Sequence, residues 1–215
     1  METRTIPDIQ VKAHTFKDGK LYAGWAPIQL PVWTGYLKVP YRKDDQGQGL
    51  NFIGISNSKD TDDRFLCSPE QHAAYFHLLD HQEKIRDAII TKLKQDFTDL
   101  LENVYDSYDT EGDSFPSLSS LTADFDFRDY IGPTSVNIEK DVKDGLAYLL
   151  WHFHCTWDTE HGFEVVTHGE RIIEIAPQAD LWKINEDNGS DNSQVSDEMR
   201  FAQLRVTKKK WWKFW

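Results

Sequence analysis

The stretch from Trp151 to His168, WHFHCTWDTEHGFEVVTH, constrains the fold more than any other part of the chain. Its first half alternates apolar and polar residues, which is the period of a β-strand with one buried face. Residues 158–161 supply a polar turn, and an apolar run begins at Phe163. The stretch therefore predicts a β-hairpin whose side chains can be assigned to faces.

The two faces of this predicted hairpin differ in chemistry. The core face carries Trp151, Phe153, Cys155 and Trp157, and the open face carries His152, His154, Thr156 and Asp158. If Trp157 pairs with Phe163, His152 lies opposite His168. His152, His154 and His168 would then offer imidazole nitrogens, which zinc and iron accept together with water. The alternative is a half-solvated sheet face whose histidines bind no metal.

Residues 158–162, DTEHG, close the hairpin. Asp158 can accept backbone N–H groups of the turn, and Gly162 can adopt a positive φ. Glu160 and His161 project at the tip, where we favour exposed residues of a satisfied turn over an acid–base pair. Trp157 is expected to be buried against helices, with its indole N–H bonded to an acceptor.

The chain before the hairpin divides into a β segment and a helical segment. Residues 1–58 predict short strands, with a hairpin after Asp18-Gly19, an aromatic edge strand over 29–39 and a strand over 50–56. Ser68-Pro69-Glu70-Gln71 predicts a helix start with a capping box. Apolar residues then recur at helical spacing as far as residue 104, and the polar residues 81–83 predict a break into two antiparallel helices.

Residues 134–178 predict a β-meander that contains the hairpin. Together the segments predict an α+β domain over residues 1–182, with β structure over 1–58, helices over 68–106, and a mostly antiparallel sheet that carries a helical pair on one face. Residues 183–207 are polar and predict a flexible tether with a short helix or strand. Residues 208–215 form a basic and aromatic tail.

Charge and composition restrict the partners. The net charge is −12, and residues 205–215 contribute five positive charges and no negative one, which leaves −17 for residues 1–204. A body this acidic argues against a nucleic-acid partner, because binding phosphates needs a cationic surface. Two cysteines suit a reduced interior, and neither a signal peptide nor a bilayer-spanning run is evident, so we expect a cytoplasmic protein.

The sequence of the hairpin also resembles the signature of a known family. Trp157-Asp158-Thr159-Glu160-His161-Gly162-Phe163, with the apolar strand, short return and Ala179-Asp180 that follow, resembles the W-D-x-E-H-G-hydrophobic-G signature of an uncharacterised bacterial family, known only as a domain of unknown function. The helix start at 69–71 and the segment 31–36 are similar too, so the resemblance covers most of residues 20–182. It implies a bacterial cytosolic α+β protein without an established activity. Some comparable small acidic families serve as immunity proteins to toxins.

The tail, KKKWWKFW, carries four aromatic side chains, which are costly to leave in water and so predict a binding surface that covers them. These residues are Trp211, Trp212, Phe214 and Trp215. Docking onto protein, whether its own body, a second copy or a receptor, is favoured over contact with an anionic membrane, which would repel the acidic body.

No phosphate-binding loop, nucleophile elbow or H-E-x-x-H zinc motif is present, so the sequence indicates no cofactor and favours a non-enzymatic protein over an enzyme, without deciding between them. The sequence favours a protein-binding module, immunity-like in form, whose acidic surface engages a basic partner. Its binding residues would be Trp157, Asp158, Glu160 and His161 together with the tail aromatics. The alternatives are a metal-dependent hydrolase that uses the histidine-rich hairpin and a peripheral membrane protein bound through the tail.

Overall fold

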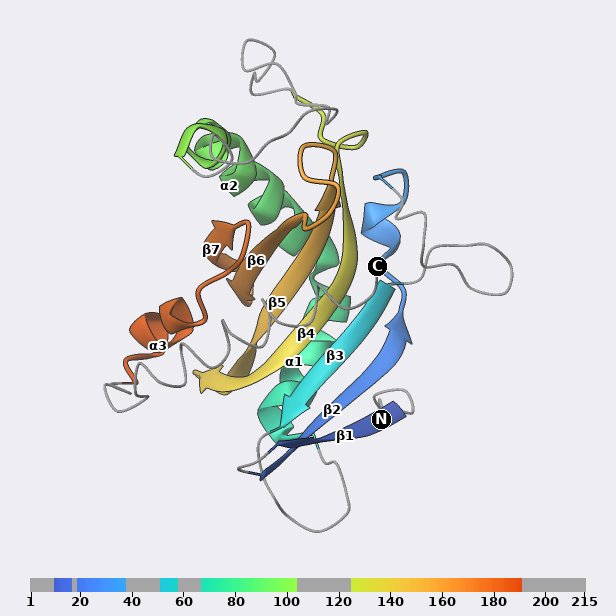
Figure 1. Cartoon of the computed structure of the whole chain (residues 1–215), viewed down its shortest axis with the longest axis vertical. Helices are drawn as coiled ribbons and strands as arrows, with labels where there is room; N and C mark the ends of the chain where they lie inside the picture. Colours follow the sequence, from blue (N-terminus) through green and yellow to red (C-terminus); the bar gives the residue numbers. More distant parts are fainter. Residues whose placement is uncertain (1–9, 17–18, 38–50, 58–66, 104–124, 191–215) are drawn as a thin grey trace.

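The computed structural model describes residues 10–16, 19–37, 51–57, 67–103 and 125–190. Seven strands form one sheet in which spatial order follows chain order (Figure 1). The strands are β1 (Gln10–Phe16), β2 (Gly19–Ile28), β3 (Asn51–Asn57), β4 (Ile131–Lys143), β5 (Leu146–Cys155), β6 (Phe163–His168) and β7 (Arg171–Ala176). Neighbours are antiparallel except β3 and β4, which are parallel because the helical segment connects them as a crossover. The predicted α+β class, with a mostly antiparallel sheet, is confirmed.

The predicted helix start is confirmed in atomic detail. In α1 (Pro69–Asp80) the Ser68 side chain accepts a hydrogen bond from the Gln71 backbone N–H at 3.1 Å. The Gln71 side chain in turn accepts from the Ser68 N–H at 3.0 Å. This reciprocal pair satisfies two backbone donors that would otherwise lack partners at the helix end.

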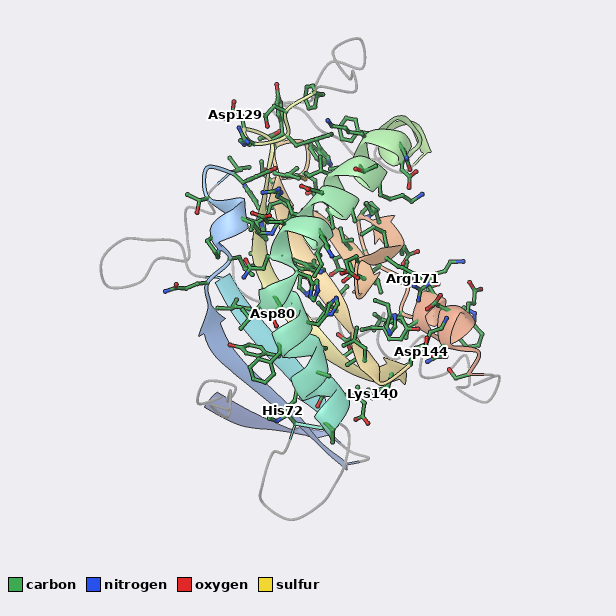
Figure 2. The ribbon with its side chains drawn as sticks, turned by 180° about the vertical axis from the view of Figure 1, so that it is seen from behind. His72, Asp80, Asp129, Lys140, Asp144 and Arg171 are labelled. Carbon is green, nitrogen blue, oxygen red and sulfur yellow. The ribbon has the colours of Figure 1, made fainter. Side chains whose placement is uncertain are left out.

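A break occurs at His81, inside the predicted interval, and α2 (Gln82–Asn103) follows at once. The expectation of two antiparallel helices is wrong. One linking residue is too short for an antiparallel helical hairpin, which needs roughly 2–5 residues. Instead, α2 continues away from α1 along the same face of the sheet (Figure 2). The apolar stripe of both helices is fully buried there and comprises Ala74, Leu78, Ile85, Ile89, Leu93 and Phe97.

The segment expected to be an edge strand over 29–39 forms a short 3₁₀ helix, η1 (Pro31–Trp33), so that prediction is wrong. Pro31 occupies its first turn, where the missing N–H costs nothing. Trp33 is buried against Phe153 and Trp151, with ring centroids 5.3 and 6.3 Å apart. Burial of this indole, rather than strand alternation, fixes the conformation.

The second face of the sheet holds a smaller core. Tyr148, Leu150 and Val166 pack with Ile184 of α3 (Trp182–Asn188). Figure 2 shows Arg171 and Asp144 beside this helix. The helix α3 lies at the start of residues 183–207, the segment that the sequence predicts to be a flexible tether with a short helix or strand. The rest of that tether and the tail, residues 191–215, lie outside the described residues.

Candidate functional site

The β5–β6 connection, residues 156–162, carries the sequence signature, and its strand register differs from the prediction. Phe153 pairs with Phe163, and β5 ends at Cys155. The predicted pairing of Trp157 with Phe163 is therefore wrong by four residues. Because four is an even number, the assignment of side chains to the two faces survives.

Trp157 leaves the strand and fills the core beneath the connection. Its ring is stacked on Phe163, with centroids 5.7 Å apart, and meets Phe97 of α2 edge-on at 5.0 Å. The predicted burial is confirmed, since the residue is 0% exposed. The predicted acceptor for its indole N–H is wrong, because this buried Nε1 has no hydrogen-bond partner within the described part of the chain. Ring burial at this site outweighs the lost hydrogen bond.

Asp158 and Gly162 set the shape of the connection as predicted. The Asp158 carboxylate accepts a hydrogen bond from the His161 backbone N–H at 2.8 Å, and its carbonyl accepts from the Gly162 N–H at 2.9 Å. Gly162 has φ of 70°, and an added Cβ would lie 1.9 Å from the Phe153 carbonyl oxygen. Only glycine fits there. Buried Asp158 therefore supports the exposed tip of the connection from within.

The exposed residues of the connection lie beside a second exposed turn. Thr159, Glu160 and His161 are exposed, and so are residues 126, 128 and 129 of the turn that precedes β4. The Thr156 N–H donates to the Tyr130 carbonyl at 3.0 Å and ties the two turns together at one end of the sheet (Figure 1). We call residues 126–129 and 159–161 the acidic loop pair.

The acidic loop pair presents three carboxylates and one guanidinium. These groups are Asp126, Asp129, Glu160 and Arg128. The Asp126 carboxylate accepts from the Arg128 N–H at 3.0 Å, which fixes its turn. The imidazole of His161 lies 3.2 Å from the Asp158 carboxylate. This arrangement suits recognition of a cationic surface.

His152 lies opposite Glu164 rather than His168. Its Nδ1 is 3.0 Å from the Glu164 carboxylate and its Nε2 is 3.1 Å from the Asn137 amide. The ring therefore links Glu164 of β6 to Asn137 of β4 across the central strand. His154 shares its face, and burial lowers the pKa of its ring.

His168 lies too far along β6 to join His152. It is four residues beyond Glu164, which is about 13 Å at roughly 3.3 Å per residue. Its Nε2 donates to the Lys143 carbonyl at 2.9 Å, and its Nδ1 is 3.3 Å from Arg171. The structure therefore does not bring His152, His154 and His168 together around one ion.

Next to His152 lies a buried carboxyl group, Glu139 of β4. Burial, supported by Asp141, raises the pKa of Glu139 to about 7, against an opposing effect of His152. The carboxyl therefore titrates near neutral pH and not in the usual acid range of a glutamate.

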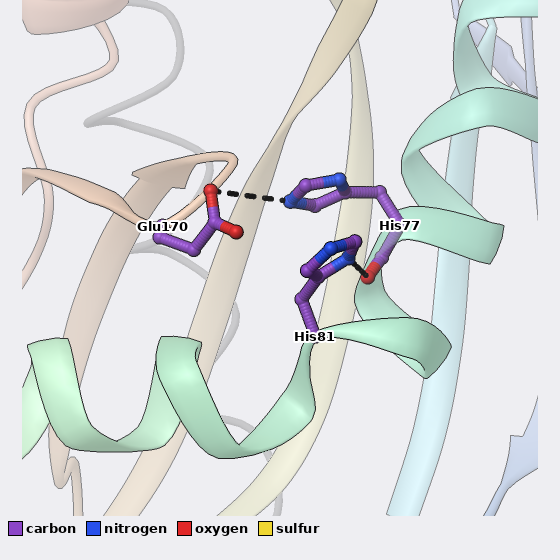
Figure 3. A group of neighbouring side chains, drawn as sticks. All are labelled: His77, His81 and Glu170. Carbon is purple, nitrogen blue, oxygen red and sulfur yellow. Dashed lines mark hydrogen bonds and ion pairs between the residues drawn. The ribbon is translucent and has the colours of Figure 1, made fainter.

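A different group of residues, which the sequence did not reveal, could hold a metal ion. His77 of α1, His81 at the α1–α2 junction and Glu170 of the β6–β7 turn face one another (Figure 3). Their ligand atoms all lie within 4.8 Å of one another, and no other group of this kind occurs in the described ranges. The spacing H-x-x-x-H at 77–81 was the available signal, because it places two imidazoles on one helix face. Glu170 could not be found from local sequence.

Comparison with known proteins gives one match. The family described as Domain of unknown function (DUF6985) matches residues 24–182, which include the sheet from β3 to β7 and both long helices. No curated protein and no solved structure matches the chain. Within the described residues, no helix is long and apolar enough to cross a membrane.

Proposed function

We propose that this chain, which belongs to the DUF6985 family, is a non-enzymatic protein-binding module that presents its acidic loop pair to a basic partner. The observation that carries the proposal is that the segment 157–162 combines buried structural residues with exposed ones. Trp157, Asp158 and Gly162 are buried and hold the connection in place, whereas residues 159–161 are exposed. A rigid scaffold that displays an exposed loop is the common arrangement of binding proteins.

Charge supports a cationic partner. The acidic loop pair carries three acids against one arginine, and the whole chain carries −12. Complementary charge accelerates association and disfavours wrong partners, and it makes binding sensitive to salt. An immunity protein, which neutralises a toxin by binding it, is one form of this function, and its support here is the acidity and modest size of the chain.

The proposal is tested by capture from the native host with matched baits. One bait removes three charges of the acidic loop pair (Asp126→Asn, Asp129→Asn and Glu160→Gln), and amides at these positions keep the hydrogen-bond acceptors. A control bait removes three exposed acids elsewhere (Glu83→Gln, Asp87→Asn and Glu186→Gln).

We expect the wild type and the control bait to retain the same basic protein at low salt and to release it at high salt. The loop-pair bait should not retain it. Equal retention by both variants, or the absence of any protein that distinguishes them, would contradict the proposal.

A further inference from the structure

We propose that His77, His81 and Glu170 form a binding site for a divalent late first-row metal ion, of which Zn²⁺ is the representative. Two imidazoles and one carboxylate are a donor set that zinc uses in proteins, with the fourth position left to water. The site joins three separate places in the fold, namely the end of α1, the α1–α2 junction and the β6–β7 turn (Figure 3). This inference is independent of the acidic loop pair.

The separation of the ligand atoms fits one ion. His77 Nε2 and the Glu170 carboxylate oxygen are 3.5 Å apart. Two ligands at about 2.0–2.1 Å from a tetrahedral zinc ion lie roughly 3.3–3.4 Å apart. The two imidazoles are stacked, with centroids 4.1 Å apart and an interplanar angle of 18°, so one ring must turn out of the stack before both lone pairs point at one ion.

A hydrogen bond to the backbone determines which ring nitrogen of His81 carries the proton. Its Nδ1 is 3.1 Å from the His77 carbonyl oxygen, an acceptor, so Nδ1 carries the proton. Nε2 is then unprotonated and has a free lone pair for a metal. A ligating histidine in metal sites ordinarily donates its other N–H to a carbonyl or a carboxylate in this way.

His77 supplies the independent observation that points to a ligand. Its Nε2 is buried and makes no hydrogen bond within the described residues, and its polar neighbour is the Glu170 carboxylate 3.5 Å away. The β6–β7 turn also lies against it, so an added Cβ on Gly169 would be 3.6 Å away. A neutral imidazole, with one ring nitrogen unprotonated, is the form that binds a metal.

A bound ion would fasten the helix junction to the sheet. His81 marks the only break between α1 and α2, and a bond from this point to the β6–β7 turn would fix the bend. A ligand that binds only the folded state raises its stability. Metal binding and thermal stability are therefore linked in this site.

The test is calorimetric titration of the full chain, purified without a polyhistidine tag, with Zn²⁺. We expect one equivalent to bind and to raise the melting midpoint. The variants His81→Asn and Glu170→Gln should each weaken binding by about 100-fold or more, because even the loss of a group that only supports a ligand costs about 10–100-fold. The control His72→Ala removes an exposed histidine of α1 and should leave binding unchanged.

Co²⁺ provides a second readout that does not depend on stability. The wild type should give the intense visible absorption of a tetrahedral ion, and Glu170→Gln, which keeps the shape of this half-buried turn residue, should lose it. Binding by both variants with wild-type affinity, or no stoichiometric binding by the wild type, would overturn the proposal.

Discussion

Trp157 and Gly162 hold the β5–β6 connection by opposite means. The tryptophan fills a space between the sheet and α2, and the glycine leaves a space that the Phe153 carbonyl occupies. Both signature residues therefore have a structural role. The exposed residues 159–161 between them have no such role, and our proposal gives them to binding.

Replacing Trp157 by alanine should lower the free energy of unfolding by about 3–5 kcal/mol, the usual cost of removing a large buried aromatic ring. Chemical denaturation measures this change. The matched control is Trp182→Ala on α3, which is 39% exposed and should change stability by only about 0.5 kcal/mol or less. Equal denaturation midpoints for Trp157→Ala and the wild type would show that the ring is not part of the core.

Glu139 should make stability depend on pH. Its pKa in the folded state, about 7, lies above the ordinary value of 4.5, so its stabilising contribution is complete below about pH 4.5 and is lost as the pH rises through 7. Glu139→Gln removes this loss. We expect the variant to exceed the wild type by up to about 3 kcal/mol above pH 7, and by much less near pH 4.5.

The control for this comparison is Glu83→Gln, which removes an exposed carboxyl of α2. Its difference from the wild type should stay small at every pH. Urea denaturation at a series of pH values measures the free energy of unfolding of both variants. If Glu139→Gln and Glu83→Gln showed the same pH dependence, the burial of Glu139 would be contradicted.

At the scale of elements, the Asp187 carboxylate joins α3 to the sheet, in addition to the packing of Ile184. Asp187 accepts two hydrogen bonds from Arg171, at 2.9 and 3.0 Å, and one from the Tyr148 hydroxyl at 2.7 Å, and it lies 3.2 Å from the Lys143 ammonium. The bonds from Arg171, with those from Tyr148 and Lys143, hold the pKa of Asp187 well below its usual range. The docking of α3 is thus strongest above the usual pKa of an aspartate.

Removing this charge should release α3 without unfolding the sheet. In Asp187→Asn, amide hydrogen exchange over residues 182–188 should become faster, while exchange in β5 stays slow. Because the folded pKa is depressed, the wild type should show the same release as acid titrates the group below about pH 4. Glu186→Gln, on the exposed side of α3, serves as the control, and equal exchange in both variants would refute the role of Asp187.

The elements show where sequence reasoning succeeds and where it stops. The capping box at Ser68 and Gln71 was predictable because both partners lie within one turn of helix. The path of α2, the parallel pairing of β3 with β4 and the β5–β6 register were not, since each depends on which distant surfaces bury each other. The same reason explains why Glu170 was missed: its neighbours are about 90 residues away in the chain.

At the scale of the whole molecule, charge is unevenly divided along the chain. Residues 205–215 are entirely basic among their charged groups, and the rest is strongly acidic. The tail lies outside the described residues, so its destination stays a prediction. Docking onto protein remains favoured, on the body of the same chain, on a second copy or on a receptor.

Deletion of residues 208–215 should leave the melting midpoint unchanged and abolish that docking interaction. Gel filtration and partner capture with the full and the truncated chain measure the loss. Flotation with anionic liposomes distinguishes the alternative, because co-flotation that requires the tail at physiological salt would favour the membrane over protein as its destination.

The role of the acidic loop pair is tested most directly by calorimetric titration of the captured, purified partner at two salt concentrations. The double variant Asp129→Asn and Glu160→Gln should keep the wild-type melting midpoint and bind about tenfold more weakly at low salt, since about 1.4 kcal/mol of lost attraction is a factor of ten. The difference should shrink at high salt, where charges are screened. Wild-type affinity of this variant at low salt would contradict the proposed function.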